Sequence, residues 1–440
     1  MSAAESSVSG ARPGGLLRRH RDFRLLWGGE VAGKFGAAVT GVVMPLAAVS
    51  LMDASTFAVS LLSAATWLPW LVVGLPVGAW VDRLPRRPIM LASATVSLGL
   101  FLSIPLTHRA GLLTFGWLLA VSLLAGVAAV FFQTAYTVFL PSILDPEDLQ
   151  EGNAALHGSA SAAMIAGQGG GGLVVQLMGA VNGLLINAAT FAVSLICLLG
   201  IRHRERPAAK EPRTPGALAR EVGQGLVLVA RDPWFRALTL YSAASNVALM
   251  GYQSIVVVFL VKDIQLASGV VGALIAVSNA GGIIGALISR KVADRIGTAR
   301  ALLVFGLWQP MLALLIPLTF AGPGLLFYAV GGFCVSAAVV AENVIKSGFQ
   351  QRYCPPELLG RLSASSYFLS YGALPLGALL GGVLGTTLGV RPAIWLLTAG
   401  VPLAGLILLA SPVRGRRDLP VAPPAGADRC DLGTSLNGTG

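Results

Sequence analysis

The stretch GLPVGAWVDRLPRRPIML at residues 74–91 recurs in altered form as ALISRKVADRIGTARALL at residues 286–303. In both copies an Asp-Arg pair ends one apolar run, and another apolar run begins soon after it. The aspartates of the two copies, Asp82 and Asp294, are 212 residues apart. The chain therefore carries the same loop twice, each time between segments that are apolar enough to cross a membrane.

A second match supports an internal duplication. The run PEDL at 146–149 corresponds to PELL at 356–359, at an offset of 210 residues. Three glycines match at that same offset, namely Gly167, Gly171 and Gly172 with Gly377, Gly381 and Gly382. Nearly equal offsets in independent features predict a duplicated six-helix unit. Because six is even, both copies cross the membrane in the same sense, as parallel repeats around a central cavity.

The composition predicts a membrane protein. Of the 440 residues, 55% are hydrophobic and 12% are charged, whereas about a quarter of a soluble domain is charged. Twelve apolar runs have roughly the length needed to cross the hydrocarbon core, near 24–50, 58–80, 89–107, 113–137, 155–178, 180–200, 236–261, 268–289, 301–320, 324–345, 360–388 and 392–411. We expect an all-α membrane protein with twelve transmembrane helices.

The net charge of +11 reports orientation. If the N-terminus is inside, 27 of the 31 Lys and Arg residues lie on the cytoplasmic side, and three, Arg109, Lys262 and Arg391, lie outside. The remaining one, Lys34, lies within the first run. This asymmetry is the positive-inside pattern. It predicts a plasma-membrane protein with both termini in the cytosol, and it removes the reason to expect nucleic-acid binding.

The same pattern divides the chain. We expect a cytoplasmic N-terminal segment at 1–23, a six-helix bundle at 24–200, a cytoplasmic linker at 201–235 and a second bundle at 236–411. The linker is rich in Pro and Arg. The tail at 412–440 is rich in Pro, Gly and small polar residues, which predicts disorder.

The loop at 74–91 resembles the signature of the major facilitator superfamily, Gly-x-x-x-Asp-Arg-x-Gly-Arg-Arg. Gly78, Asp82, Arg83, Arg86 and Arg87 are in register, while Pro85 replaces a glycine. The stretches HRDFRLLWGGEVAGKFGAAVTGVVMPLA (20–47) and LPSILDPEDLQEGNAAL (140–156) resemble the branch that contains enterobactin exporters and macrolide or multidrug efflux proteins. The resemblance covers residues 16–411 and implies a transporter that works by alternating access.

The chain also departs from that branch. Residues 113–137 contain no arginine, although many proton-coupled drug antiporters have one in this span. The Gly-Pro element associated with exporters lacks its proline at 167–172, while Pro375-Leu376-Gly377 retains one.

Six residues of the repeated loop are candidates for a gate. They are Asp82, Arg83, Arg86, Arg87, Asp294 and Arg295. A carboxylate beside arginines can form charge-assisted hydrogen bonds that lock one access state. Alternatively, the arginines only anchor the topology. Arg290 replaces the expected glycine in the second copy.

Glu30 and Lys34 lie one helical turn apart on the same face of the first span. Counted from Phe23, they lie roughly 10 Å and roughly 16 Å into the membrane. Ionisable groups at such depth usually face a cavity or each other. The pair is thus either responsive to protons or substrate, or a self-neutralised structural ion pair.

Glu342 and Lys346 repeat this spacing near the cytoplasmic end of the tenth run. We expect Lys346 to snorkel to the interface. Glu342 is expected to face the cavity, because the resemblance implies that spans one, four, seven and ten line it. Further cavity candidates are Gln133, Tyr136, Asn246 and Gln253. Their alternative role is interhelical hydrogen bonding.

No cofactor or metal site is predicted. GGEVAGK at 28–34 resembles a phosphate-binding loop, but Phe35 follows where Ser or Thr is required, and the run begins a membrane helix. The four cysteines form no Cys-x-x-Cys pair, and no nucleophile with a base is found, so we expect no enzyme. The interpretation is a monomeric exporter of an amphipathic small molecule, driven by proton antiport. Alternatives are an importer or uniporter of a polar nutrient and a non-transporting receptor.

Overall fold

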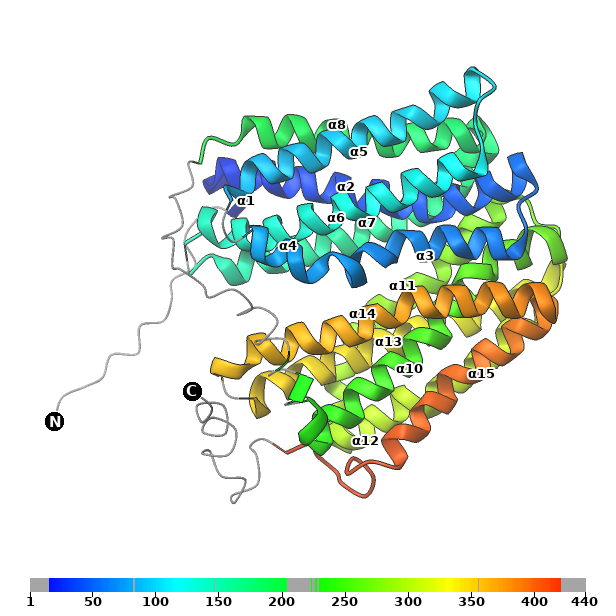
Figure 1. Ribbon diagram of the computed structural model, residues 1–440. Coiled ribbons are helices and arrows are strands. Elements are labelled where there is room, and N and C mark those ends of the chain that lie inside the picture. Colours follow the sequence, from blue (N-terminus) through cyan, green and yellow to red (C-terminus); the bar gives the residue numbers. More distant parts are fainter. Residues whose placement is uncertain are drawn as a thin grey trace.

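The computed structural model describes residues 16–81, 84–145, 147–203, 223, 226–227, 229–354 and 356–420. The first bundle comprises α1 (Leu16–Arg19), α2 (Arg21–Met52), α3 (Thr56–Val72), α4 (Gly74–Val81), α5 (Arg86–Arg109), α6 (Phe115–Ile143), α7 (Leu149–Met178) and α8 (Ala180–Gly200). The second comprises α10 (Pro233–Val258), η1 (Phe259–Asp263), α11 (Ser268–Ile296), α12 (Thr298–Leu303), η2 (Val304–Trp308), η3 (Gln309–Leu318), η4 (Gly322–Gly324), α13 (Leu325–Tyr353), α14 (Pro356–Thr387) and α15 (Val390–Leu409). Figure 1 shows the two bundles stacked side by side.

The described helices account for twelve membrane crossings, so the predicted fold class is confirmed. Ten helical segments are long and apolar enough to cross a bilayer, and α3 is a shorter apolar helix that continues into α4. Helix α7 has 30 residues, a length of about 45 Å. Its many Gly, Ala and Ser residues lower its hydropathy without shortening it.

Local signals explain where helices begin. The hydroxyl of Ser55 accepts a hydrogen bond from the Ala58 amide and starts α3. The carboxylate of Asp232 accepts from the amides of Trp234 and Phe235 and starts α10. Such caps satisfy amides that have no partner within the helix.

The ninth crossing is irregular. A π-helical turn, η2, is followed by the 3₁₀ segment η3, which contains Pro310 and Pro317. Proline lacks the amide hydrogen and its ring clashes with the preceding turn. The regular α-helical ladder therefore ends before Pro310.

The two bundles meet through small residues. A side chain added at Gly172 of α7 would lie 2.7 Å from the Gly272 backbone of α11. On α14, Gly382 packs in the same close manner against Ser60 of α3. Small residues let helix backbones approach within a membrane. We call the end of the molecule that contains these four residues the closed end.

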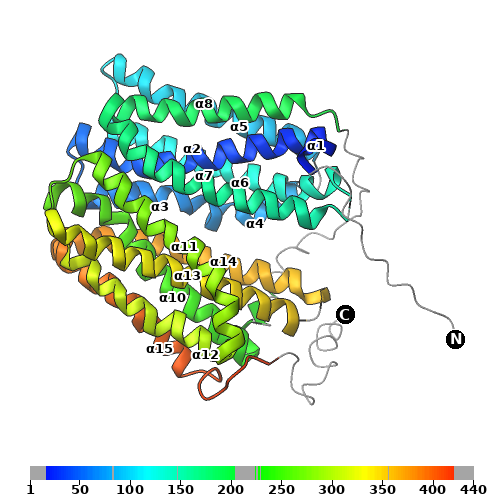
Figure 2. The same ribbon diagram turned by 180° about the vertical axis from the view of Figure 1, so that it is seen from behind.

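The opposite end carries α1 and residues 410–420, and we call it the terminal end. Figures 1 and 2, which view the molecule from opposite sides, show the helices of the two bundles spreading apart toward it. Part of the expected disordered tail is ordered here, because Val413 and Leu419 are buried. The Asp418 carboxylate accepts a hydrogen bond of 2.9 Å from the Thr298 amide. The residues after 420 lie outside the described part of the chain.

Candidate functional site

Glu30 and Lys34 form an ion pair inside the first bundle. The Nζ–Oε1 distance is 3.1 Å, and Glu30 is only 8% exposed. Lys34 also donates to the Gln133 side chain of α6 at 3.1 Å. The structure therefore joins three of the predicted residues into a bridge between α2 and α6. The Lys34 side chain keeps 37% of its surface exposed.

Tyr136 lies one turn beyond Gln133 on α6 and is 7% exposed. Its ring stacks on Phe132, with centroids 6.4 Å apart. Its hydroxyl is buried and has no hydrogen-bond partner among the described residues. Glu30 lies within electrostatic range of this hydroxyl. The first bundle thus holds a carboxylate, a lysine, an amide and a tyrosine in one place.

Glu342 and Lys346 form the corresponding pair in the second bundle, with an Nζ–Oε1 distance of 3.1 Å. The hydroxyl of Tyr241 on α10 donates to Glu342. Lys346 donates to Ser242 of α10 at 2.9 Å and is only 9% exposed. The expectation that Lys346 snorkels to the interface was wrong. The buried carboxylate and hydroxyl give its ammonium group better partners inside the bundle.

The two clusters occupy equivalent places in the duplicated units. Tyr241 lies 211 residues after Glu30, and Lys346 lies 210 residues after Tyr136. Glu342 lies 209 residues after Gln133. The offsets of 211 and 210 agree with those of the repeated motifs, and the third is one residue shorter. The carboxylate therefore lies on the first helix of one pair, α2, and on the second helix of the other, α13. Tyr241 and Ser242 were missed from the sequence, but this offset from Glu30 was the signal that could have found Tyr241.

The remaining cavity candidates lie apart from these clusters. Asn246 of α10 donates to the Ser370 carbonyl of α14 at 3.0 Å, which is an interhelical hydrogen bond. Gln253 is exposed on α10.

The candidate gate is only partly described. Asp82 and Arg83 lie outside the described residues. Arg87 donates to the carbonyls of Leu198 and Leu199 at 3.1 and 3.0 Å. This contact ties α5 to the C-terminal end of α8 within one bundle, where carbonyl groups favour a cation. Arg86 is half-buried at the start of α5.

In the second copy of the loop, Asp294 pairs with Arg290 on the same helix at 3.8 Å. These two side chains are 72% and 90% exposed, and Arg295 is exposed as well. Exposed pairs of this kind contribute little to stability.

A link between the bundles was not foreseen. Lys262 of η1 pairs with Asp53, in the turn between α2 and α3, at 2.7 Å. It also donates to the Ala54 carbonyl at 3.2 Å. The Lys262 ammonium group lowers the pKa of Asp53 by hydrogen bonding and by charge attraction. Both residues are at the closed end, far from the glutamates in the chain, and neither lies in a recognisable motif.

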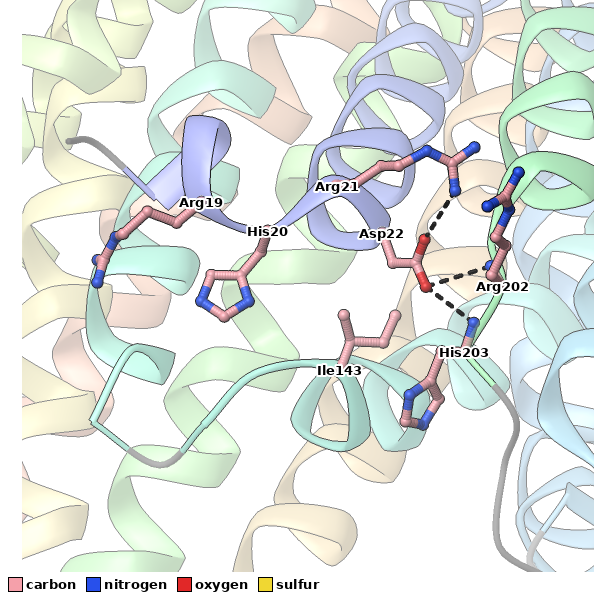
Figure 3. A pocket seen from close by; sticks show the side chains of 7 residues that line it. All are labelled: Arg19, His20, Arg21, Asp22, Ile143, Arg202 and His203. Atoms are coloured by element: carbon pink, nitrogen blue, oxygen red, sulfur yellow. Dashed lines mark hydrogen bonds and ion pairs between the residues drawn. The ribbon is translucent and has the colours of Figure 1, made fainter.

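A polar cluster surrounds the start of α2 at the terminal end. Figure 3 shows Asp22 directed at the backbone of Arg202 and His203, which donate to it at 3.2 and 2.8 Å. Around it lies an open pocket of about 360 Å³, lined by Arg19, His20, Arg21, Asp22, Ile143, Arg202 and His203. The pocket joins the start of α2 to the ends of α6 and α8.

His20, Asp145 and Asp148 lie near this pocket, with possible ligand atoms within 4.8 Å of one another. Arg19 and His20 already bond the two carboxylate oxygens of Asp148, at 3.2 and 3.0 Å. A metal ion there would have to displace both. The arrangement is thus that of an internal charge cluster that fixes the start of α2 to the loop between α6 and α7.

Comparisons with known proteins identify relatives of this chain. The model of the Major Facilitator Superfamily matches residues 26–375. The multidrug efflux pump Tap of Mycolicibacterium fortuitum is 26% identical over 383 residues, covering 84% of this chain and 91% of that protein. Tap of Mycobacterium tuberculosis H37Rv is 25% identical, covering 84% and 88%.

Solved structures share the fold. A bacterial homologue of the iron transporter ferroportin, in an inward-facing state, has a TM-score of 0.72 at 16% identity, covering 89% of this chain and 98% of that one. The nucleoside transporter NupG has a TM-score of 0.71 at 13% identity, covering 88% and 98%.

Proposed function

Because the chain belongs to the major facilitator superfamily, we propose that it exports an amphipathic small molecule across the plasma membrane in exchange for protons. The superfamily membership and the multidrug efflux pumps among its relatives support transport in the outward direction. The observation that carries the proton-coupled part is the buried Glu30–Lys34 pair.

The orientation follows from the charge distribution. With 27 of 31 Lys and Arg residues on the side of the termini, the terminal end faces the cytosol. The closed end then faces the outside, and the helices of the two bundles spread apart toward the cytosolic side (Figure 1). The close glycine contacts bring the two bundles together at the closed end.

Glu30 is the proposed coupling residue. Its carboxylate holds Lys34 at 3.1 Å, and Lys34 in turn holds Gln133. Protonation removes the charge that holds Lys34, and this weakens the bridge between α2 and α6. A proton that binds one arrangement better than the other shifts the equilibrium between access states. Glu342 is fixed by Tyr241 and Lys346, which favours a supporting role for it.

Aromatic side chains supply an apolar surface where the bundles face each other. Trp67 and Trp70 of α3 both stack with Tyr371 of α14, at centroid distances of 6.0 and 6.2 Å. Flat aromatic faces accommodate many apolar molecules of different shape. This surface and the charged pair together favour a substrate with an apolar body and a polar group.

Everted membrane vesicles test the proposal. Ethidium, a lipophilic cation, and a neutral macrolide serve as probes, each with a proton gradient and after a protonophore has collapsed it. We expect uptake of at least one probe that the protonophore abolishes and that vesicles without the protein lack. Uptake at the same rate with and without the protonophore would contradict proton coupling. Movement only in the inward direction in right-side-out vesicles would favour an importer or uniporter.

A further inference from the structure

Within the proposed transport cycle, we infer that Tyr136 is the hydrogen-bond partner that Glu30 takes when protonation releases it from Lys34. The inference rests on the proposed function, because the transport cycle supplies the step in which Glu30 is protonated. The hydrogen bond itself can be detected without transport.

The hydroxyl of Tyr136 supplies the first observation. It is buried, the residue is 7% exposed, and no hydrogen-bond partner lies within the described part of the chain. Burial of an unpaired hydroxyl is costly, and native proteins rarely keep one without a reason. A partner that appears in another state of the protein is such a reason. Glu30 is the buried carboxylate within electrostatic range.

The second bundle shows that side chains at the equivalent positions reach each other. There the Tyr241 hydroxyl donates to Glu342, which also holds Lys346. The two sites are related by the internal repeat, with offsets of 211 residues for Glu30 and Tyr241 and 210 for Tyr136 and Lys346. At these equivalent positions the Lys346 ammonium group lies 5.4 Å from the centroid of the Tyr241 ring, so side chains at the two positions meet between the helices. In the first bundle the same two positions hold the carboxylate of Glu30 and the hydroxyl of Tyr136, which is unpaired among the described residues.

Among the described residues, few other groups lie near Glu30. The titratable ones are Lys34 on α2, Tyr136 on α6 and Cys197 on α8. The neutral hydroxyl of Ser194, also on α8, lies as close to Gly29 as the Cys197 side chain does. On the α7 side, Trp27 bonds the neutral Ser159. A protonated carboxyl group has one hydrogen to donate and an oxygen that accepts. The tyrosine hydroxyl can both accept and donate, so it matches the hydrogen-bonding capacity of the protonated carboxyl group.

The exchange moves one proton and breaks no bond between heavy atoms. A hydronium ion on the side to which the site is open gives its proton to the Glu30 carboxylate and leaves a water molecule. Lys34, 37% exposed and held by Gln133, stays charged and turns toward solvent. Tyr136 keeps its own proton throughout and is a positioning residue.

Infrared difference spectroscopy of the full-length protein in lipid tests this assignment. The sample is acidified from about pH 8 to about pH 5, toward the ordinary pKa of a carboxyl group. This change is expected to produce a carboxylic-acid C=O band that Glu30→Gln removes. In the wild type the band lies at a hydrogen-bonded frequency, and in Tyr136→Phe it moves to higher wavenumber. Tyr328→Phe removes another buried hydroxyl, on α13, and leaves the band in place.

A second readout does not depend on a Tyr136 variant. With ring-labelled tyrosine, acidification of the wild type perturbs a tyrosine C–O stretch, and Glu30→Gln abolishes this change. The inference is overturned if Tyr136→Phe leaves the carboxyl band unmoved, or if no band sensitive to Glu30→Gln appears. If the bands behave as expected while no probe is transported, the proposed function fails and the hydrogen-bond exchange stands.

Discussion

Lys262 of the second bundle reaches Asp53 of the first, with 2.7 Å between Nζ and Oδ1, and this pair lies at the end where the bundles touch. The Asp53 side chain is 93% exposed, so the pair is a surface ion pair between the two bundles, and we propose that it acts as a latch. We expect Asp53→Asn to raise the population in which the closed end has opened by about two- to fivefold, the size typical of exposed pairs. Electron-spin distance measurements between labels at Leu112 and Ala321 would detect this, and Lys262→Met should match it.

The latch also has a defined pH dependence. Lys262 holds the pKa of Asp53 below its ordinary value. The contribution of the pair is therefore complete above the ordinary carboxyl pKa of about 3.9 and is lost as the pH falls through the lowered value. Between pH 5 and pH 8 we expect no change from this source. A label distance that varied over this neutral range in the wild type and not in Asp53→Asn would refute the assignment.

Close backbone contact at the closed end predicts a position-specific effect on transport. A side chain at Gly172 would meet the Gly272 backbone at 2.7 Å, whereas Gly170, two residues away, has nothing within 4 Å of an added Cβ. Overpacking costs about 1–3 kcal/mol, so Gly172→Val should disfavour the closed arrangement and slow vesicle uptake about fivefold or more. Gly170→Val is the matched control and should transport at close to the wild-type rate. Equal rates for the two variants would exclude a sealing role for Gly172.

The buried Tyr241–Glu342–Lys346 cluster predicts strong coupling in stability. Loss of a hydrogen bond to a buried charge costs about 1.5–3 kcal/mol, so Tyr241→Phe should lower the melting temperature of the purified protein. Glu342→Gln leaves Lys346 as a buried cation with a weaker partner and should destabilise further. The double variant Glu342→Gln/Lys346→Met should be more stable than Glu342→Gln alone. Additive losses would mean that the three side chains do not act as a unit.

The hydrogen bonds between the tail and Thr298 predict local opening of α12 when they are removed. Asp418 caps the Thr298 amide, and the Leu419 amide donates to the Thr298 hydroxyl at 2.8 Å. Removal of such a cap costs about 1 kcal/mol. Asp418→Ala should therefore increase hydrogen exchange at 297–303 about fivefold, while Asp418→Asn, which retains an acceptor, should change it little. Unchanged exchange in Asp418→Ala would show that the Asp418 hydrogen bond does not stabilise the start of α12.

The sequence predicted the fold because its signals are additive over many residues. The lengths of the apolar runs, the loop repeat and the charge asymmetry each depend on many residues. A single exception, such as the Gly-rich α7, therefore did not change the predicted fold. The Glu30–Lys34 and Glu342–Lys346 pairs were also predictable, because both lie at helical spacing within one element.

Contacts between elements were harder to predict. Lys262 and Asp53 are 209 residues apart, and neither position is unusual for an exposed loop charge. Lys346 was placed at the interface because a lysine near a helix end can usually reach water. Its actual position depends on Tyr241 and Ser242 of a neighbouring helix, which no pattern within its own span reveals. The order of residues 412–420 likewise depends on a loop far away in the chain.

The most direct test of the account is a comparison of proton-driven accumulation with downhill exchange of ethidium, in proteoliposomes that contain either the wild type or Glu30→Gln. Glutamine keeps the size of the side chain and cannot exchange a proton. We predict that both proteins exchange ethidium down its gradient, while only the wild type accumulates it when a proton gradient is imposed. Accumulation by Glu30→Gln at the wild-type level would contradict the claim that this buried carboxylate couples protons to export.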